Sequence, residues 1–196
     1  MLVITGTLFF FHHRGHGGHG VLLIKQKKLY VLCALCGEFP YLCSVMEKFE
    51  LHILGCGSAL PTTRHFATSQ VVNVRDKLYM IDCGEGSQLQ FRKSRLKFSR
   101  LNHIFISHLH GDHCFGLLGL ISTLNLLGRT AELHIHSPKG LEALFVPMLS
   151  FFCRQMTYQV LFHEFETKEP GMIYEDRSLT VTTIPVSYTH LRAHET

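Results

Sequence analysis

The spacing of apolar residues predicts strands and helices in alternation between residues 50 and 185. Stretches that alternate apolar and polar side chains, or that are briefly apolar between turn residues, predict strands at 50–55, 69–74, 77–82, 102–106, 132–136, 157–163 and 178–185. Apolar residues at i, i+3 and i+4 predict helices at 86–95, 114–127 and 139–153. Adjacent strands come first and strands alternating with helices follow, an order that predicts an α/β fold with a mixed sheet covered by helices.

The two ends of the chain lack this pattern. Residues 1–45 include the low-complexity stretch "FFFHHRGHGGHG", and Met46 opens a segment that leads into the first strand. We expect residues 1–45 to be an extension outside the fold and residues 46–185 to form the domain. The alternative for the extension is a metal-loading tail with four histidines, His12, His13, His16 and His19.

The last residues, "VSYTHLRAHET" at 186–196, resemble the translation of a sequencing-library adapter. We expect the authentic sequence to be cut near Pro185, and the fold prediction leaves this tail out.

Composition narrows the class of protein without identifying it. Of the 196 residues 46% are hydrophobic and 17% charged, which is typical of one globular domain. A net charge of +4 mildly favours an anionic partner. No uncharged apolar run approaches the roughly 20 residues that span a bilayer, so we expect no membrane association.

The number and spacing of the cysteines indicate the cellular compartment of the protein. Seven cysteines, odd in number and irregularly spaced, favour reduced thiols and a cytoplasmic location. Cys33 and Cys36 form a CxxC pair and Cys43 follows, but no fourth partner nearby would complete a structural zinc site.

The segment "ISHLHGDHCFG" at 106–116 holds four metal-ligand side chains in six positions. His108 and His110 leave the end of a predicted strand two residues apart, so both can face one ion. Asp112 and His113 stand at the start of the next helix and can face a second ion. Imidazole and carboxylate suit zinc, with manganese or iron possible. The alternative is structural, with Asp112 capping the helix.

Three blocks of sequence resemble the ribonuclease Z family of the metallo-β-lactamase superfamily. They are "LGCGSALPTTRHFATS" at 54–69, "LYMIDCGEGSQLQ" at 78–90 and "FSRLNHIFISHLHGDHCFGLLGL" at 98–120. The last contains the HxHxDH signature of the superfamily. The likeness covers about residues 46–185 and implies an αββα sandwich, of which this chain holds roughly the N-terminal half.

The resemblance also implies roles for the site residues. His108 and His110 would bind a first zinc, and Asp112 and His113 a second, with Asp112 accepting a proton. Asp82, at the end of its strand, matches the buried aspartate that braces the metal loops of the superfamily.

One departure concerns the remaining ligands. The family has its next histidine ligand at or near the position of Tyr188, and its other ligands would lie beyond residue 196. His190 and His194 fall in the adapter-like tail, so we assign them no metal. The site is therefore expected to be incomplete in this chain.

The family's function is zinc-dependent endonucleolytic removal of the 3′ trailer from precursor tRNA, leaving a 3′-hydroxyl, and the family is usually homodimeric. Two ions would activate water and neutralise charge on the phosphate. The basic stretch "FRKSRLKFSR" supplies candidate phosphate contacts, and so does the loop "PTTRHFAT"; these residues are Arg64, Arg92, Lys93, Arg95 and Lys97. Their alternative role is an ordinary solvated surface.

Two other functions stay open. One is a different hydrolase of the same fold, such as a phosphodiesterase, an arylsulfatase-like enzyme, a lactonase or a thioesterase. The other is an inactive fragment that binds at most one ion weakly. The basic stretch favours RNA, because a hydrolase of small molecules does not need it.

Overall fold

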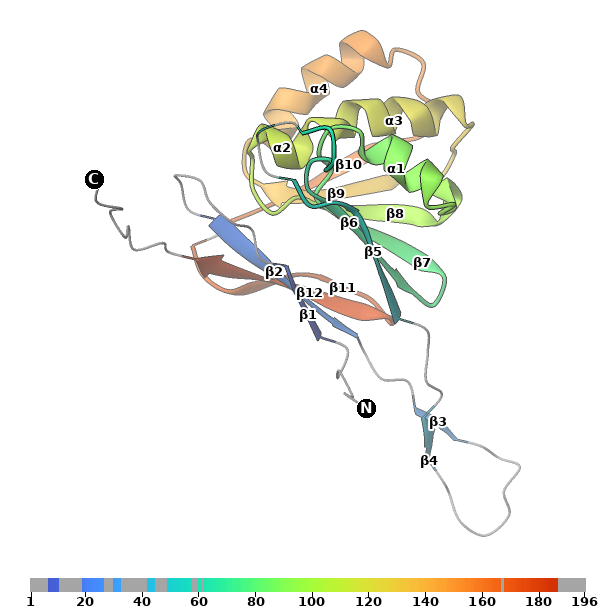
Figure 1. Ribbon diagram of the computed structural model, residues 1–196, viewed down its shortest axis with the longest axis vertical. Helices are drawn as coiled ribbons and strands as arrows, with labels where there is room; N and C mark the ends of the chain where they lie inside the picture. Colours follow the sequence, from blue (N-terminus) through green and yellow to red (C-terminus); the bar gives the residue numbers. More distant parts are fainter. Residues whose placement is uncertain are drawn as a thin grey trace, which may run out of the picture.

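A six-stranded mixed sheet forms the centre of the protein (Figure 1). The computed structural model describes residues 7–10, 19–26, 30–32, 42–44, 49–57, 60, 62–166 and 168–186. The sheet has the order β10-β9-β8-β7-β6-β5, with β7 to β10 parallel and β5 to β7 antiparallel. Its strands are β5 Phe49–Gly55, β6 Ser69–Val74, β7 Lys77–Ile81, β8 Leu101–Phe105, β9 Leu133–Pro138 and β10 Val160–Phe165.

Helices cover one face of this sheet (Figure 1). They are α1 Ser87–Lys93, α2 Gly111–Cys114, α3 Gly116–Leu126 and α4 Leu141–Phe152, with a short 3₁₀ turn at Phe98–Arg100. Alternation along the strands explains the packing. Met80, Ile104 and Ile135 point to the helical side and are fully buried there with Leu117 and Leu120 of α3. Each apolar side chain so buried contributes roughly 1.5 to 3 kcal/mol.

The apolar pattern of α4 divides into a buried and an exposed row. Leu141, Phe145 and Leu149 lie in the core. Leu144 and Phe152, which belong to the same i, i+3, i+4 pattern, are 60% and 65% exposed. The sequence pattern therefore predicts the helix correctly but overestimates how many of its residues the core takes up.

A second sheet packs on the other face of the first (Figure 1). Its order is β1-β2-β12-β11, with strands β1 Thr7–Phe10, β2 His19–Gln26, β11 Gly171–Glu175 and β12 Leu179–Val186. A separate hairpin joins β3 Tyr30–Leu32 to β4 Leu42–Ser44. The core between the sheets contains Ile24, Val72, Tyr79, Phe105 and Val181, all at most 1% exposed.

The structure differs from the expectation that residues 1–45 lie outside the fold. β2 pairs with β12 along all eight of its residues, and Ile24 is fully buried between the sheets. The physical reason is that β12 offers backbone donors and acceptors on both sides, and β11 satisfies only one side. For the rest of this segment the boundary at residue 45 stays a prediction. The histidines at 12, 13 and 16 and the CxxC cysteines lie outside the described residues.

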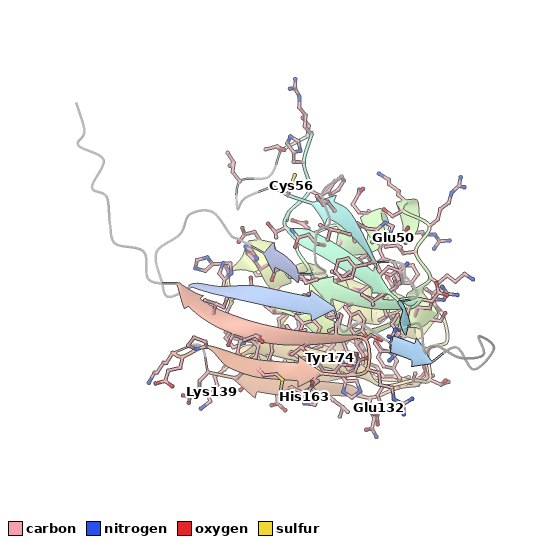
Figure 2. The ribbon with its side chains drawn as sticks, turned by 90° about the horizontal axis from the view of Figure 1, so that it is seen from below. Glu50, Cys56, Glu132, Lys139, His163 and Tyr174 are labelled. Atoms are coloured by element: carbon pink, nitrogen blue, oxygen red, sulfur yellow. The ribbon has the colours of Figure 1, made fainter. Side chains whose placement is uncertain are left out.

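Histidines replace apolar residues on part of the face between the sheets. His103 on β8 and His134 and His136 on β9 share this face, and His163 on β10 lies beside them. His103 stacks against Tyr174 of β11 with ring centroids 4.4 Å apart. Figure 2, seen from the side of the second sheet, labels Tyr174 and His163 in this region.

Burial changes the acidity of these histidines. It lowers the pKa of His103 to about 4 and that of His136 to about 3, and neighbouring imidazoles add to both shifts. His103 and His136 are therefore uncharged in the native state at neutral pH.

The layers run helix, sheet, sheet, so the α/β fold with a mixed sheet is confirmed. No helix among the described residues is long and apolar enough to cross a membrane.

We predict that acid destabilises the protein through His103 and His136. Well above pH 6.5, both histidines are neutral in both states and their contribution to stability is fully present. As the pH falls from 6.5 towards 4 and 3, the unfolded chain takes up protons that the native state does not bind, so the free energy of unfolding decreases. His136→Phe should make this decrease shallower, as measured by urea unfolding between pH 7.5 and 4.5.

The control for this measurement is the exposed His65, whose change to Gln should leave the pH dependence as it is. An equally steep loss of stability in His136→Phe would contradict the prediction.

Candidate metal centre

The candidate site lies where β7 and β8 end and α2 begins. Asp82 follows β7 directly, and its backbone N–H donates to the carbonyl of Phe105 at the end of β8. Asp82 has a φ of 55°, in the left-handed region that non-glycine residues rarely adopt. This backbone turn holds the carboxylate of Asp82 under the loop that leads from β8 to α2.

The carboxylate of Asp82 is the organising group of the site. It is 3% exposed and accepts hydrogen bonds from the backbone N–H of Ser107 at 2.8 Å and from the Ser107 hydroxyl at 2.9 Å. His113 Nδ1 donates to its other oxygen at 2.7 Å. A buried carboxylate needs such donors, because burying the charge alone would cost several kcal/mol.

This contact fixes which nitrogen of His113 faces the site. A carboxylate only accepts hydrogen bonds, so Nδ1 carries the proton and Nε2 presents its lone pair in the neutral ring. His113 is fully buried, which keeps the ring in this orientation. The same arrangement of carboxylate, imidazole and ion orients histidines in many zinc proteins.

The four predicted ligand residues come together at this loop. The ring centroids of His108 and His113 are 3.8 Å apart, and those of His108 and His110 are 4.6 Å apart. His108 is buried and His110 is exposed. Asp112 Oδ2 lies 3.5 Å from His113 Nε2, and its side chain is 8% exposed.

The distance between Asp112 and His113 provides a test of fit for a metal ion. Two acceptors that face each other at 3.5 Å repel unless a proton or a cation lies between them. Two ligands of a tetrahedral zinc at about 2.1 Å stand roughly 3.4 Å apart, so this pair matches the donor chemistry and spacing of zinc. No three His, Cys, Asp or Glu side chains in the described part of the chain form a group that could hold an ion.

Close packing of three loops shapes the site. Gly84 follows the Asp82 turn, and a Cβ there would stand 2.4 Å from the carbonyl oxygen of Asp112 and 2.6 Å from the Cβ of Ala67. The segment 106–113, which carries the predicted ligands, is called the metal loop. Only glycine allows the β5–β6 loop and the metal loop to approach this closely. The backbone N–H of Cys83 donates to the carbonyl of His113 at 2.7 Å, which ties the loops together.

The predicted RNA-contact residues all lie on the surface. Arg92 and Lys93 form the last turn of α1, and Arg64 lies in the β5–β6 loop. Arg95 and Lys97 follow α1 and are also exposed. Lys93 Nζ stands 5.6 Å from the ring centre of Phe66. Phe91 is fully buried, and its ring centroid lies 4.6 Å from that of Phe98, which packs against the same core.

Comparison with known proteins places the chain in a family. A family model described as Anti-Pycsar protein Apyc1 matches residues 49–150. Ribonuclease Z of Bacteroides thetaiotaomicron is 81% identical over 143 residues, which are 73% of this chain and 45% of that protein. Ribonuclease Z of Porphyromonas gingivalis is 59% identical over 73% of this chain and 47% of its own length. The chain thus spans about half the length of the curated relatives it matches.

Solved structures agree with this placement. The crystal structure of human tRNase Z, short form, has a TM-score of 0.60 at 26% identity and covers 68% of this chain and 64% of its own. A long form RNase Z from yeast, at 23% identity and a TM-score of 0.51, covers 61% of this chain and 16% of its own, and supports the fold alone. The chain therefore belongs to the family of metallo-β-lactamase-fold proteins that the Apyc1 model describes, and the likeness to ribonuclease Z that its sequence predicted is confirmed.

Proposed function

We propose that this chain is the metal-binding part of an endoribonuclease that removes the 3′ trailer from precursor tRNA. The reaction is hydrolysis of one phosphodiester bond, and it leaves a 3′-hydroxyl on the tRNA. The observation that carries the proposal is the gathering of His108, His110, Asp112 and His113 around one loop, in a chain 81% identical to a ribonuclease Z.

Family membership implies a divalent metal cofactor. We assign His108 and His110 to one zinc and Asp112 and His113 to a second, with manganese or iron as alternatives that suit the same donors. When bound, the ions supply Lewis acidity that lowers the pKa of water and neutralises charge on the phosphate. Each ion would receive two donors from these residues, and zinc would need further donors to complete four-coordination.

The protein's own residues orient the donors and handle the proton. Asp82 keeps the Nε2 lone pair of His113 directed into the site by accepting a hydrogen bond from Nδ1–H. The carboxylate of Asp112 takes up the proton that the attacking water loses. Its side chain is almost fully buried, so bulk water competes little for this role.

Exposed basic residues would hold the RNA backbone. Arg64, Arg92, Lys93, Arg95 and Lys97 are candidates because all are solvent-accessible. Arg100, by contrast, pairs with Asp76 at 2.8 Å and is less available. Contacts of this kind make binding depend on salt, with log K changing by about 0.7 per phosphate contact on single strands for each tenfold change in salt.

Three further proposals come from the family alone. The protein acts in the cytoplasm, functions as a homodimer and makes no membrane contact. Size-exclusion chromatography with light scattering tests the homodimer.

A second candidate function is hydrolysis of a smaller phosphodiester by the same site. It is favoured by the Apyc1 family model, whose name is not that of a ribonuclease. The two candidate functions are separated by comparing turnover of precursor tRNA with turnover of a nitrophenyl phosphodiester. Only the RNA enzyme needs the basic surface, so only it should favour the tRNA.

We predict that Asp112→Ala lowers cleavage of precursor tRNA by at least about 100-fold, because it removes both a proton acceptor and a metal donor. RNA binding should stay within about twofold, since the phosphate contacts lie elsewhere. Both are measured on this chain and on a form extended to the length of its relatives, with the exposed Glu169→Ala as control. Near-normal turnover in the extended Asp112→Ala form would remove Asp112 from the mechanism.

We predict that Asp82→Asn weakens zinc binding by about 10- to 100-fold. An amide in this place can turn an N–H towards His113 Nδ1, which favours the tautomer whose Nε2 is protonated and cannot bind metal. The affinity is measured by competition with a chromophoric chelator at pH 7.5. Asp76→Asn serves as the matched control, and equal affinities in Asp82→Asn and the unaltered chain would refute the bracing role.

A further inference from the structure

Two exposed aromatic rings border the candidate metal centre. Phe115 follows α2 directly and is 72% exposed, and Phe66 in the β5–β6 loop is 41% exposed. Single exposed apolar side chains are common on proteins, so exposure alone means little. Here both rings adjoin the loops that carry the predicted ligands, and each packs against a glycine.

The ring of Phe115 lies directly against the metal loop. A Cβ on Gly111 would stand 2.3 Å from two carbon atoms of this ring, so the ring contacts the bare backbone between His110 and Asp112. The loop thus supports the ring from beneath while most of its surface faces solvent. Any polymer whose phosphate reaches the metal ligands would pass beside this ring.

The ring of Phe66 is paired with a positive charge. It packs against Gly86, where a Cβ would stand 2.8 Å from a ring carbon. Lys93 Nζ stands 5.6 Å from the ring centre, within the range of a cation–π contact. An aromatic face and a cation are therefore combined on one surface.

The two rings belong to one assembly of loops. Gly84 contacts both Ala67, which follows Phe66, and Asp112, which lies three residues before Phe115. The β5–β6 loop and the metal loop are therefore held against each other, with an exposed ring in the first and one beside the second. In Figure 2 Cys56, the first residue of the β5–β6 loop, lies across the molecule from His163 and Lys139.

We propose that Phe115 and Phe66 are stacking platforms for unpaired nucleobases of the RNA next to the bond that is cut. The inference rests on the proposed function and deepens it. Aromatic stacking with adjacent cations is how proteins hold single-stranded nucleic acid, and every base offers a face for it. The charge of Lys93 beside Phe66 favours a polyanion over an apolar protein surface as the occupant.

The test is binding of this chain to a short single-stranded RNA that contains the fluorescent base 2-aminopurine at successive positions. Stacking on an aromatic ring quenches this base. We expect quenching at one or two positions, its loss in Phe115→Ala, and about tenfold weaker binding. Phe115→Tyr keeps an aromatic ring and should restore both the quenching and the affinity. Phe115→Leu keeps only an apolar side chain over Gly111 and should restore neither.

The salt dependence of RNA binding separates the contribution of stacking from the contribution of charge. Phe115→Ala and Phe66→Ala should lower the affinity without changing the slope of log K against log salt, because stacking releases no counterions. Lys93→Ala should reduce that slope by about 0.7. The matched control is Phe151→Ala, since Phe151 is 63% exposed and also carries a cation, Arg154, at 5.6 Å, but lies on α4.

The outcomes distinguish the two proposals. If the RNA binds but Phe115→Leu and Phe66→Ala retain full quenching and affinity, the stacking inference is overturned and the proposed nuclease function stands. If the unaltered chain binds no single-stranded RNA, the stacking inference is overturned, whereas the nuclease proposal is decided by cleavage of precursor tRNA by the extended form. If Phe151→Ala weakens binding equally, the effect is not specific to these rings and the inference also fails.

Discussion

The hydrogen bonds of the Asp82 carboxylate are the constraint on which the candidate site depends. One buried charge connects the end of β7 to Ser107 after β8 and to His113 in α2. Removing these donors would leave an unpaired charge in the core, so the three segments have to stay together. The left-handed backbone of Asp82, which costs of order 1 to 3 kcal/mol, persists because the same contacts fix it.

Much of the fold could be predicted because most of its strands and helices show a clear period. β6 was predicted with its observed bounds, and β5, β7 and β8 lie within one residue of theirs. β11 was missed, since "GMIYE" is short and has no clear alternation. The position of residues 19–26 could not be predicted either, because it depends on an edge of β12 that is distant in sequence.

The candidate site was predictable to the extent that its residues are adjacent in the chain. His108, His110, Asp112 and His113 are four of six consecutive positions, so any loop there brings them close. Asp82 is 31 positions before His113, and only the family resemblance pointed to it. Phe66 and Phe115 carried no sequence signal, because exposure of an aromatic ring depends on tertiary packing. The histidines between the sheets likewise carry no signal in the sequence, since pairing of β8, β9 and β10 brings them together.

X-ray absorption at the zinc edge of the zinc-loaded protein tests the central claim most directly. That claim is that Asp82 holds imidazole and carboxylate donors in place for metal. The account predicts a first shell of nitrogen and oxygen at about 2.0 to 2.2 Å with the multiple-scattering pattern of imidazole. A first shell dominated by sulfur at about 2.3 Å, from cysteines such as Cys83 and Cys114 beside the loop, would contradict it.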